Sequence, residues 1–215
     1  KKITDMKKVL LTIAFVIAMT ISASAQFKPF QLGLKIEPGI GWAKLNTDHL
    51  YDGVTKMDFG WGFVGNIYFV ENYGISTGFN VRFMNSEYKF NTHTDGEITR
   101  IIKNQYFEIP FGLTMRTEEM SGIRIMGNVS YGLGFLWNSK ERNYNAAGDE
   151  VNMLTDYNKS RHTLIVKLGL EYEILDSSCL TAALVFNNNV SNIYAKEYQQ
   201  NVLLNSISLE IGFMF

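Results

Sequence analysis

The side chains best suited to acid–base or metal chemistry in this sequence lie in polar stretches between apolar runs. They are three histidines, His49, His93 and His162, and four aspartates, Asp48, Asp52, Asp95 and Asp156. A hydrolytic triad needs a positioned nucleophile, a base and an orienting group, and no nucleophile motif accompanies these residues. No close ligand pair such as H-x-H suggests a metal site. We therefore interpret them as solvated loop residues, and we expect no catalytic residue, no metal and no cofactor.

A glycine-rich stretch offers a second kind of chemistry. Residues 60–65 read GWGFVG and match the pattern G-x-G-x-x-G. In a dinucleotide-binding protein this pattern follows a strand and opens a helix. Here it lies inside a run of alternating aromatic and small residues, which predicts a strand. We expect no cofactor-binding residues in it.

A third candidate is a set of charged residues spaced among apolar ones. It contains Lys35, Glu37, Arg82, Glu108, Arg124, Lys167, Glu171 and Glu210. These are four bases and four acids, and Arg116 and Glu173 raise the count to five of each. An unpaired buried charge is costly, so balanced charges are what a confined interior requires. The set predicts a charge network inside the protein.

Period-two alternation positions these charges. In residues 32–37, LGLKIE, every second residue is apolar. Eight such runs predict eight strands, with boundaries uncertain by a few residues. They lie near 32–42, 59–69, 74–83, 107–116, 123–137, 164–173, 180–187 and 206–215.

The connections between these runs alternate in length. The long ones lie near 43–57, 85–104, 138–161 and 188–202, and the short ones near 70–73, 117–122 and 175–178. An even number of strands, with tight turns at one end and long loops at the other, is typical of outer-membrane barrels. We predict an all-β fold: an eight-stranded antiparallel up-and-down transmembrane β-barrel with four long extracellular loops and short periplasmic turns.

The direction of the apolar face decides between a membrane barrel and a soluble lipocalin-like carrier, which would bury that face inside. Glycines collect on the polar face, where a narrow lumen needs small residues beside long ones. Aromatic residues gather near the strand ends, where bilayer interfaces favour them. Those expected at the interfaces are Trp42, Trp61, Trp137, Tyr172, Phe213 and Phe215. We therefore predict that the apolar face meets lipid and that the last strand pairs with the first, since hydrocarbon leaves no edge unpaired.

The first residues predict export. Residues 6–26, MKKVLLTIAFVIAMTISASAQ, have two lysines, an apolar run and an A-x-A ending. This order is typical of a secretory signal peptide cleaved before Gln26. The 13-residue run of 9–21 is short of the ~20 residues that span a bilayer, so a retained anchor is the lesser alternative. We expect 1–25 to be a signal peptide, with 1–5 non-native, and 26–215 to be the barrel domain.

Several stretches resemble a known family. They are QYFEIPFGLTMR (105–116), YGLGF (131–135), LGLEYEI (168–174) and the terminal Phe215. The chain resembles the small OmpA-like barrels of Gram-negative outer membranes, and more narrowly the porin-family or PorT-like group. The resemblance implies an integral outer-membrane barrel, and some PorT-like members are linked to protein secretion.

These observations predict a non-enzymatic protein of the Gram-negative outer membrane with a structural, binding or secretion-associated role and a side-chain-filled lumen. A narrow channel for small ions or solutes is the alternative, and an outer-membrane enzyme or a soluble lipocalin-like carrier is less favoured. The expected partners are outer-membrane lipid, the barrel-assembly machinery through the C-terminal strand, and an unknown secretion or loop partner. The formal charge of -1 speaks against nucleic acid.

Overall fold

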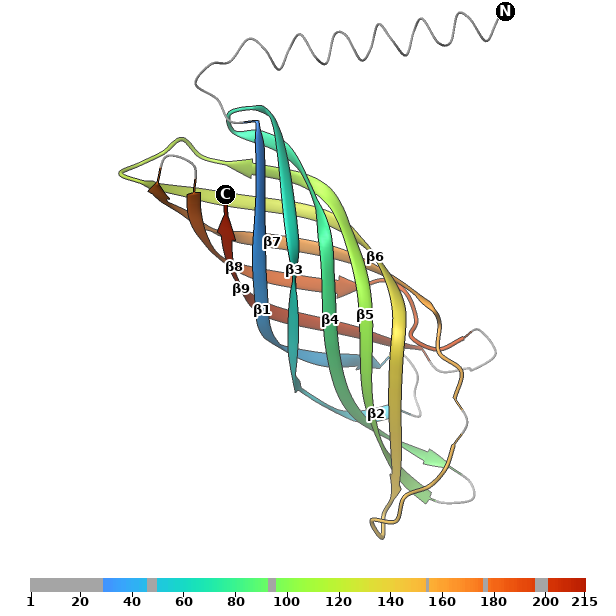
Figure 1. The fold of residues 1–215 in the computed structure, drawn as a ribbon. Coiled ribbons are helices and arrows are strands. Elements are labelled where there is room, and N and C mark those ends of the chain that lie inside the picture. Colours follow the sequence, from blue (N-terminus) through green and yellow to red (C-terminus); the bar gives the residue numbers. More distant parts are fainter. Residues whose placement is uncertain (1–28, 46–49, 93–95, 154, 176–177, 196–200) are drawn as a thin grey trace, which may run out of the picture.

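A computed structural model describes residues 29–215 except 46–49, 93–95, 154, 176–177 and 196–200. The expected signal peptide, 1–25, lies outside the described residues. Figure 1 shows the strands wrapping into one barrel, with β1 beside β9. No helix in the described ranges is long and apolar enough to cross a membrane.

The barrel wall contains eight long antiparallel strands. They are β1 (Phe30–Leu45), β3 (Lys56–Val70), β4 (Tyr73–Thr92), β5 (Gly96–Arg116), β6 (Ile123–Asn145), β7 (Ser160–Leu175), β8 (Ser178–Asn189) and β9 (Val202–Met214). Each pairs with the next around the wall, and β9 pairs back to β1. The short β2 (Leu50–Val54) lies in the connection from β1 to β3 and pairs with β4. The predicted eight-stranded up-and-down barrel is confirmed.

The seam between the first and last strands is closed along its length. Leu34 lies opposite Phe213, and Ile40 lies opposite Ile207. At the end of the seam the Phe215 N–H donates to the Leu32 carbonyl at 2.7 Å, and the Leu32 N–H donates back at 3.2 Å. The sheet therefore leaves no free edge between β9 and β1, as the alternation up to Phe215 predicts.

The outer face is apolar and exposed. Large side chains at alternate strand positions point away from the lumen, and many are about half exposed, such as Phe111 at 62% and Leu168 at 65%. Monomeric soluble proteins rarely expose contiguous apolar surface on this scale, whereas an outer-membrane barrel presents such a band to lipid. This orientation contradicts the lipocalin-like alternative.

The structure corrects the extent of the long connections. Residues 85–104 are mostly strand, because β4 continues to Thr92 and β5 begins at Gly96. Residues 138–161 likewise contain the end of β6 and the start of β7. The wall therefore continues past the apolar band on the loop side. There the polarity is reversed: Glu87 and Lys89 lie on the outer face, while Tyr88 and Phe90 are buried inside.

The interior of this extension is a hydrophobic core. Its buried members are Ala43, Leu50, Met84, Tyr88, Phe90, Ile98, Ile102, Tyr106, Ile193, Tyr194, Val202 and Leu204. Ile193 and Tyr194 belong to the connection between β8 and β9, which folds into the mouth of the barrel. The lumen thus has a polar section within the membrane band and, beyond it, a section where this core lies beside buried polar side chains, among them Arg100, Asn104 and Asn143.

Candidate functional site in the lumen and its extracellular end

All eight charged residues predicted for the lumen lie on the inner face of the wall. Six of them are buried: Lys35, Glu37, Arg82, Glu108, Glu171 and Glu210. The side chains of Arg124 and Lys167 are 17% and 11% exposed. Their ion pairs form three groups along the barrel axis.

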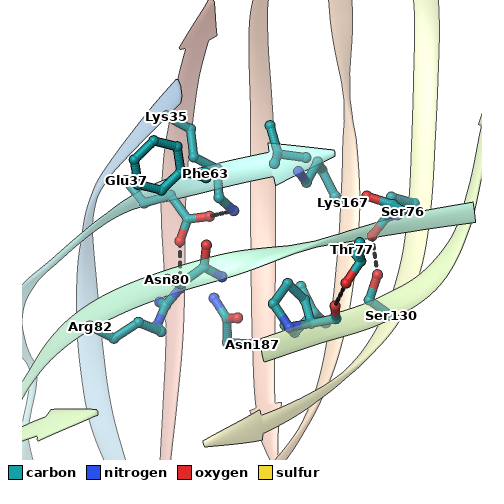
Figure 2. Close-up of a pocket in the computed structure, with 14 residues that line it drawn as sticks. Lys35, Glu37, Phe63, Ser76, Thr77, Asn80, Arg82, Ser130, Lys167 and Asn187 are labelled. Atoms are coloured by element: carbon teal, nitrogen blue, oxygen red, sulfur yellow. Dashed lines mark hydrogen bonds and ion pairs between the residues drawn. The ribbon is translucent and has the colours of Figure 1, made fainter. Parts of the chain in front are cut away.

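The central group is a continuous chain of alternating charges. Lys35 Nζ lies 2.7 Å from Glu37 Oε1 and 2.8 Å from Glu210 Oε2. Lys167 Nζ lies 2.6 Å from the other Glu210 oxygen, and Arg82 pairs with the second Glu37 oxygen. Figure 2 shows the Glu37 carboxylate between Lys35 and Arg82. Both carboxylates in this chain therefore bridge two cations each.

A second group lies toward the long connections. Arg161 Nη1 donates to Glu108 Oε2 at 2.8 Å, and both side chains are almost fully buried. The Arg161 guanidinium also lies over the Tyr106 ring, 5.5 Å from its centre. Arg161 is not among the predicted lumen residues, because 138–161 was expected to be a long connection. Lys167 faces the lumen, and every second residue before it does so too. Extending this alternation back by six residues places Arg161 in the lumen.

A third group lies at the short-turn rim. Glu171 Oε1 lies 3.2 Å from Arg116 and 3.4 Å from Arg124. Arg124 also reaches Glu173 and Glu119, each at 3.1 Å. The network therefore includes Arg116, which the alternation placed on the polar face.

Two glycines separate the partners of buried ion pairs. Gly60 lies opposite both Glu37 on β1 and Arg82 on β4, and Gly134 lies opposite both Glu108 on β5 and Arg161 on β7. A Cβ on Gly134 would lie 3.1 Å from the Arg161 Cβ. The absence of a side chain on the middle strand lets the two long side chains meet above it.

The lumen holds little free space. One cavity of about 20 Å³ is lined by Lys35, Glu37, Arg82 and Lys167 of the central group. A second of about 20 Å³ lies beside Glu210, Thr114 and Thr181. A water molecule needs at least ~10–15 Å³. Each cavity therefore fits about one water, and neither is a pore.

Two connections close the extracellular end together. The Asn158 N–H donates to the Ile193 carbonyl at 2.8 Å, and the Ala195 N–H donates to the Asp156 carbonyl at 3.1 Å. Tyr157 and Tyr194 form an isolated β-bridge, and their rings lie 5.4 Å apart. The connection after β6 is thereby joined to the connection after β8.

Arg100 of β5 joins this closure to the wall. Its Nε lies 3.0 Å from the Glu141 carboxylate and 2.7 Å from Asn143 Oδ1. Its guanidinium lies over the Phe90 ring at 4.6 Å. The Tyr157 hydroxyl donates to the same Glu141 carboxylate, and burial, helped by this acidic partner, raises the Tyr157 pKa above its ordinary value.

The predicted interface aromatics all lie on the outer face. Trp42 and Trp137 lie at the loop-side edge of the apolar band, where Trp137 stacks on Phe107 at 4.6 Å. The other rim carries Tyr172, Phe213 and Phe215. Trp61 departs from the expectation. It lies opposite Ile36, inside the band, because the outer face of β3 stays apolar for two more positions, Phe59 and Met57.

The other candidates have separate surroundings. Residues 60–65 lie within β3, so the GWGFVG stretch is a strand, as predicted. His49 and His93 lie outside the described residues. His162 Nδ1 lies 2.6 Å from the Tyr131 hydroxyl on the outer face of the wall. Within the described residues, no three His, Cys, Asp or Glu side chains gather into a metal-binding group.

Comparison with known proteins agrees with this architecture. Residues 11–215 match the family described as outer membrane protein beta-barrel domain. Neisserial surface protein A is 10% identical, with 86% of this chain and 96% of that chain covered and a TM-score of 0.50. OprG of Pseudomonas aeruginosa is 11% identical (85% and 95% covered, TM-score 0.48), and Ail of Yersinia pestis is 15% identical (87% and 100%, 0.44).

No curated protein matches the sequence. At these identities the neisserial structure supports the fold alone. The family match covers nearly the whole described chain, and the closed wall with its apolar outer band has the geometry that the family requires. The chain therefore belongs to the outer membrane protein beta-barrel family and is an integral barrel of the Gram-negative outer membrane in contact with its lipid.

Proposed function

We propose that this barrel is a non-enzymatic protein of the porin-family, PorT-like type that binds a partner at its extracellular end and conducts no solute. One observation carries the proposal: side chains fill two successive sections of the lumen. Ion pairs fill the section within the membrane band, and a hydrophobic core fills the section beyond it. The PorT-like assignment, with its link to protein secretion, rests on the residue likeness of 105–116, 131–135 and 168–174.

The filled lumen supports a structural role for the charge network. An eight-stranded barrel has an interior just wide enough for side chains, whereas aqueous channels occur in barrels of 16–18 strands. Lys35 is buried and ion-paired with both Glu37 and Glu210, which are buried as well. Moving an ion past them would require breaking these ion pairs, and the filled lumen leaves little room for water to solvate the separated charges.

The extracellular extension supports a binding role. β4, β5 and β6 continue beyond the apolar band, and the closure around Arg100 ties two connections to this wall. Binding residues lie disproportionately on loops that a rigid scaffold positions. Here the described parts of two connections are joined by hydrogen bonds, so a partner would meet residues that the scaffold positions.

Two measurements test this proposal. We expect purified wild-type protein to give no ion conductance in planar bilayers, and a steady conductance would favour the narrow-channel alternative. We expect pull-down after crosslinking on intact outer membranes to recover a defined partner. Substitution of His49, His93 and His162 by Ala should leave that recovery unchanged. An enzymatic activity that the wild type shows and the substituted protein lacks would favour an enzyme.

We further propose that β9 is the strand which the barrel-assembly machinery recognises. Its alternation continues to Phe213 and Phe215 on the lipid face, and it closes the barrel against β1. Phe215→Ser should slow assembly in the outer membrane, measured by heat-modifiable gel migration. Phe111→Ser is the matched control, because Phe111 is similarly exposed on the lipid face but lies in β5. Equal delay in both variants would contradict the proposal.

A further inference from the structure

Three cations lie together on the outer face of the wall, just beyond the apolar band. Lys103 of β5 lies directly opposite Lys140 of β6 in the strand pairing. Arg142, two residues further along β6, lies opposite Ile101 and therefore diagonal to Lys103. All three side chains are exposed. Like charges directly opposite in an antiparallel pair destabilise it, so this arrangement has a cost in the isolated protein.

The acids nearby on the wall do not neutralise this cluster. Glu87 and Glu97 on the outer face, and Glu141 on the inner face, each lie within 2.7–3.1 Å of a different cation. Those cations are Lys56, Lys89 and Arg100 respectively. Within the described part of the chain, no ion pair involves Lys103, Lys140 or Arg142. This cluster is therefore able to take its counter-charge from another molecule.

The surface between the two strands is hollowed at this point. A cavity of about 340 Å³ is lined by Ile101, Lys103, Gln105, Lys140, Arg142 and Tyr144. Small-molecule sites typically measure ~300–1,000 Å³ and combine a few polar groups with apolar walls. Besides the three cations, the Gln105 amide and the Tyr144 hydroxyl offer hydrogen-bond donors. The hollow therefore suits an anionic group of several heavy atoms.

The height of the cluster relative to the membrane identifies the anion. The stacked rings of Phe107 and Trp137 lie at the edge of the apolar band. Lys103 is four residues beyond Phe107 on β5, which at ~3.4 Å per residue and ~45° tilt is about 10 Å further from the membrane centre. The headgroup layer extends ~5–7 Å beyond the hydrocarbon on each side. Long Lys and Arg side chains can bend back over that distance, so their charges reach the phosphates of the lipid.

We propose that Lys103, Lys140 and Arg142 form a binding site for a phosphate group of an outer-leaflet lipid. Toward the membrane, past the pair Gln105 and Asn138, Phe107 and Trp137 form an apolar surface that acyl chains can cover. An amphiphile satisfies both surfaces at once, whereas a free anion would leave the apolar part of the site unused. Each Lys or Arg of a basic cluster beside a membrane surface strengthens the attraction to anionic lipid.

The probe is diphosphoryl lipid A, added to the refolded protein in a zwitterionic detergent, with bound lipid counted by native mass spectrometry. The wild type should retain lipid A, and the triple variant Lys103→Gln, Lys140→Gln, Arg142→Gln should bind it at least tenfold more weakly. Lys44→Gln is the matched control, because Lys44 is an exposed cation beside Trp42 in β1, with Leu203 opposite it in place of a second cation. This control should bind as the wild type does.

Two further arms separate the sources of phosphate. Dephosphorylated lipid A should not be retained, and inorganic phosphate at the same concentration should not displace lipid A. Equal retention of the dephosphorylated lipid, or equal binding by the triple variant and the wild type, would overturn the proposal. Displacement by inorganic phosphate would reduce the site to a general anion site and overturn the lipid assignment.

A stability measurement tests the same site independently of the lipid count. Without lipid A, Lys140→Gln removes a like-charge contact, so its thermal midpoint should equal or exceed that of the wild type. With lipid A, the thermal midpoint of the wild type should rise by more than that of the variant, so the wild type becomes the more stable of the two. An unchanged order in the presence of lipid A would contradict the proposal even if both proteins fold normally.

Discussion

Glu108 and Arg161 form an ion pair across the barrel interior, with a 2.8 Å hydrogen bond and side chains that are 0% and 1% exposed. They stand on β5 and β7, and the strand between them contributes only Gly134 at that level. Burying two charges costs several kcal/mol each before their attraction is counted. Much of this cost is offset because each charge has the other as its partner.

Removing one partner of this pair should destabilise the barrel. Glu108→Ala leaves the Arg161 guanidinium buried without its carboxylate, for which the expected loss is about 3–5 kcal/mol. We expect a lower denaturant midpoint in detergent and no increase in bilayer conductance, because the hydrophobic core beyond the pair still fills the lumen. The double variant Glu108→Leu, Arg161→Met should recover most of the stability. A rise in conductance for Glu108→Ala would contradict the structural role.

Filling the gap between the two partners should have a similar effect. Gly134→Val places a branched side chain where a single Cβ already lies 3.1 Å from the Arg161 Cβ. The Glu108–Arg161 pair would separate, and we expect about 1–3 kcal/mol of destabilisation from overpacking. Gly65→Val is the control, because a Cβ there meets only the flexible Leu32 side chain, at 3.4 Å. Equal unfolding midpoints for the two variants would show that strand glycines are interchangeable here.

The membrane section of the fold was predictable because one physical rule operates along its whole length. Lipid outside and a narrow polar lumen inside force apolar and polar residues to alternate, so the runs that contain Lys35, Glu108 and Glu210 could be assigned to strands and faces. Closure of β9 on β1 followed from the same rule, because an unpaired edge is too costly in hydrocarbon.

The extracellular section was not predictable in the same way, because the solvent outside the wall changes. Beyond the apolar band the outer face meets water, and the alternation continues with opposite polarity. The stretch that includes Glu87, Tyr88, Lys89 and Phe90 therefore looked like a polar loop, although it belongs to β4. Arg161 was missed for the same reason. The joining of the two extracellular connections depends on backbone hydrogen bonds between distant residues, for which the sequence carries no local signal.

The extracellular closure should open at alkaline pH. Burial raises the pKa of Tyr157 above its ordinary value of 10.0, and the acidic partner Glu141 raises it further. The closed form holds this proton more tightly than the open form does, so its stability is complete below pH 10 and falls as the pH rises above that value. Tyrosinate absorbance and limited proteolysis should change together above pH 10. In Tyr157→Phe the stability of the closure should fall less steeply with pH. Its slope should correspond to about one proton fewer released on opening. An unchanged slope would contradict this assignment.

Tyr194 should hold the closure in place through contacts with three residues, Tyr88, Tyr157 and Arg100. Its hydroxyl contacts that of Tyr88 in the core, and its ring packs on Tyr157 and lies 5.8 Å from the Arg100 guanidinium. Tyr194→Ala removes a nearly fully buried aromatic side chain, for which core truncations cost about 3–5 kcal/mol. The loss should fall on the closure, because Tyr194 belongs to the connection between β8 and β9 and packs in the extracellular core. We expect faster protease cleavage in 146–159 and an unchanged heat-modifiable barrel band. Tyr144→Ala is the control, since Tyr144 lies on the outer face of β6. If Tyr194→Ala also lost the folded band, the extracellular core would be required for the whole barrel and not for its closure alone.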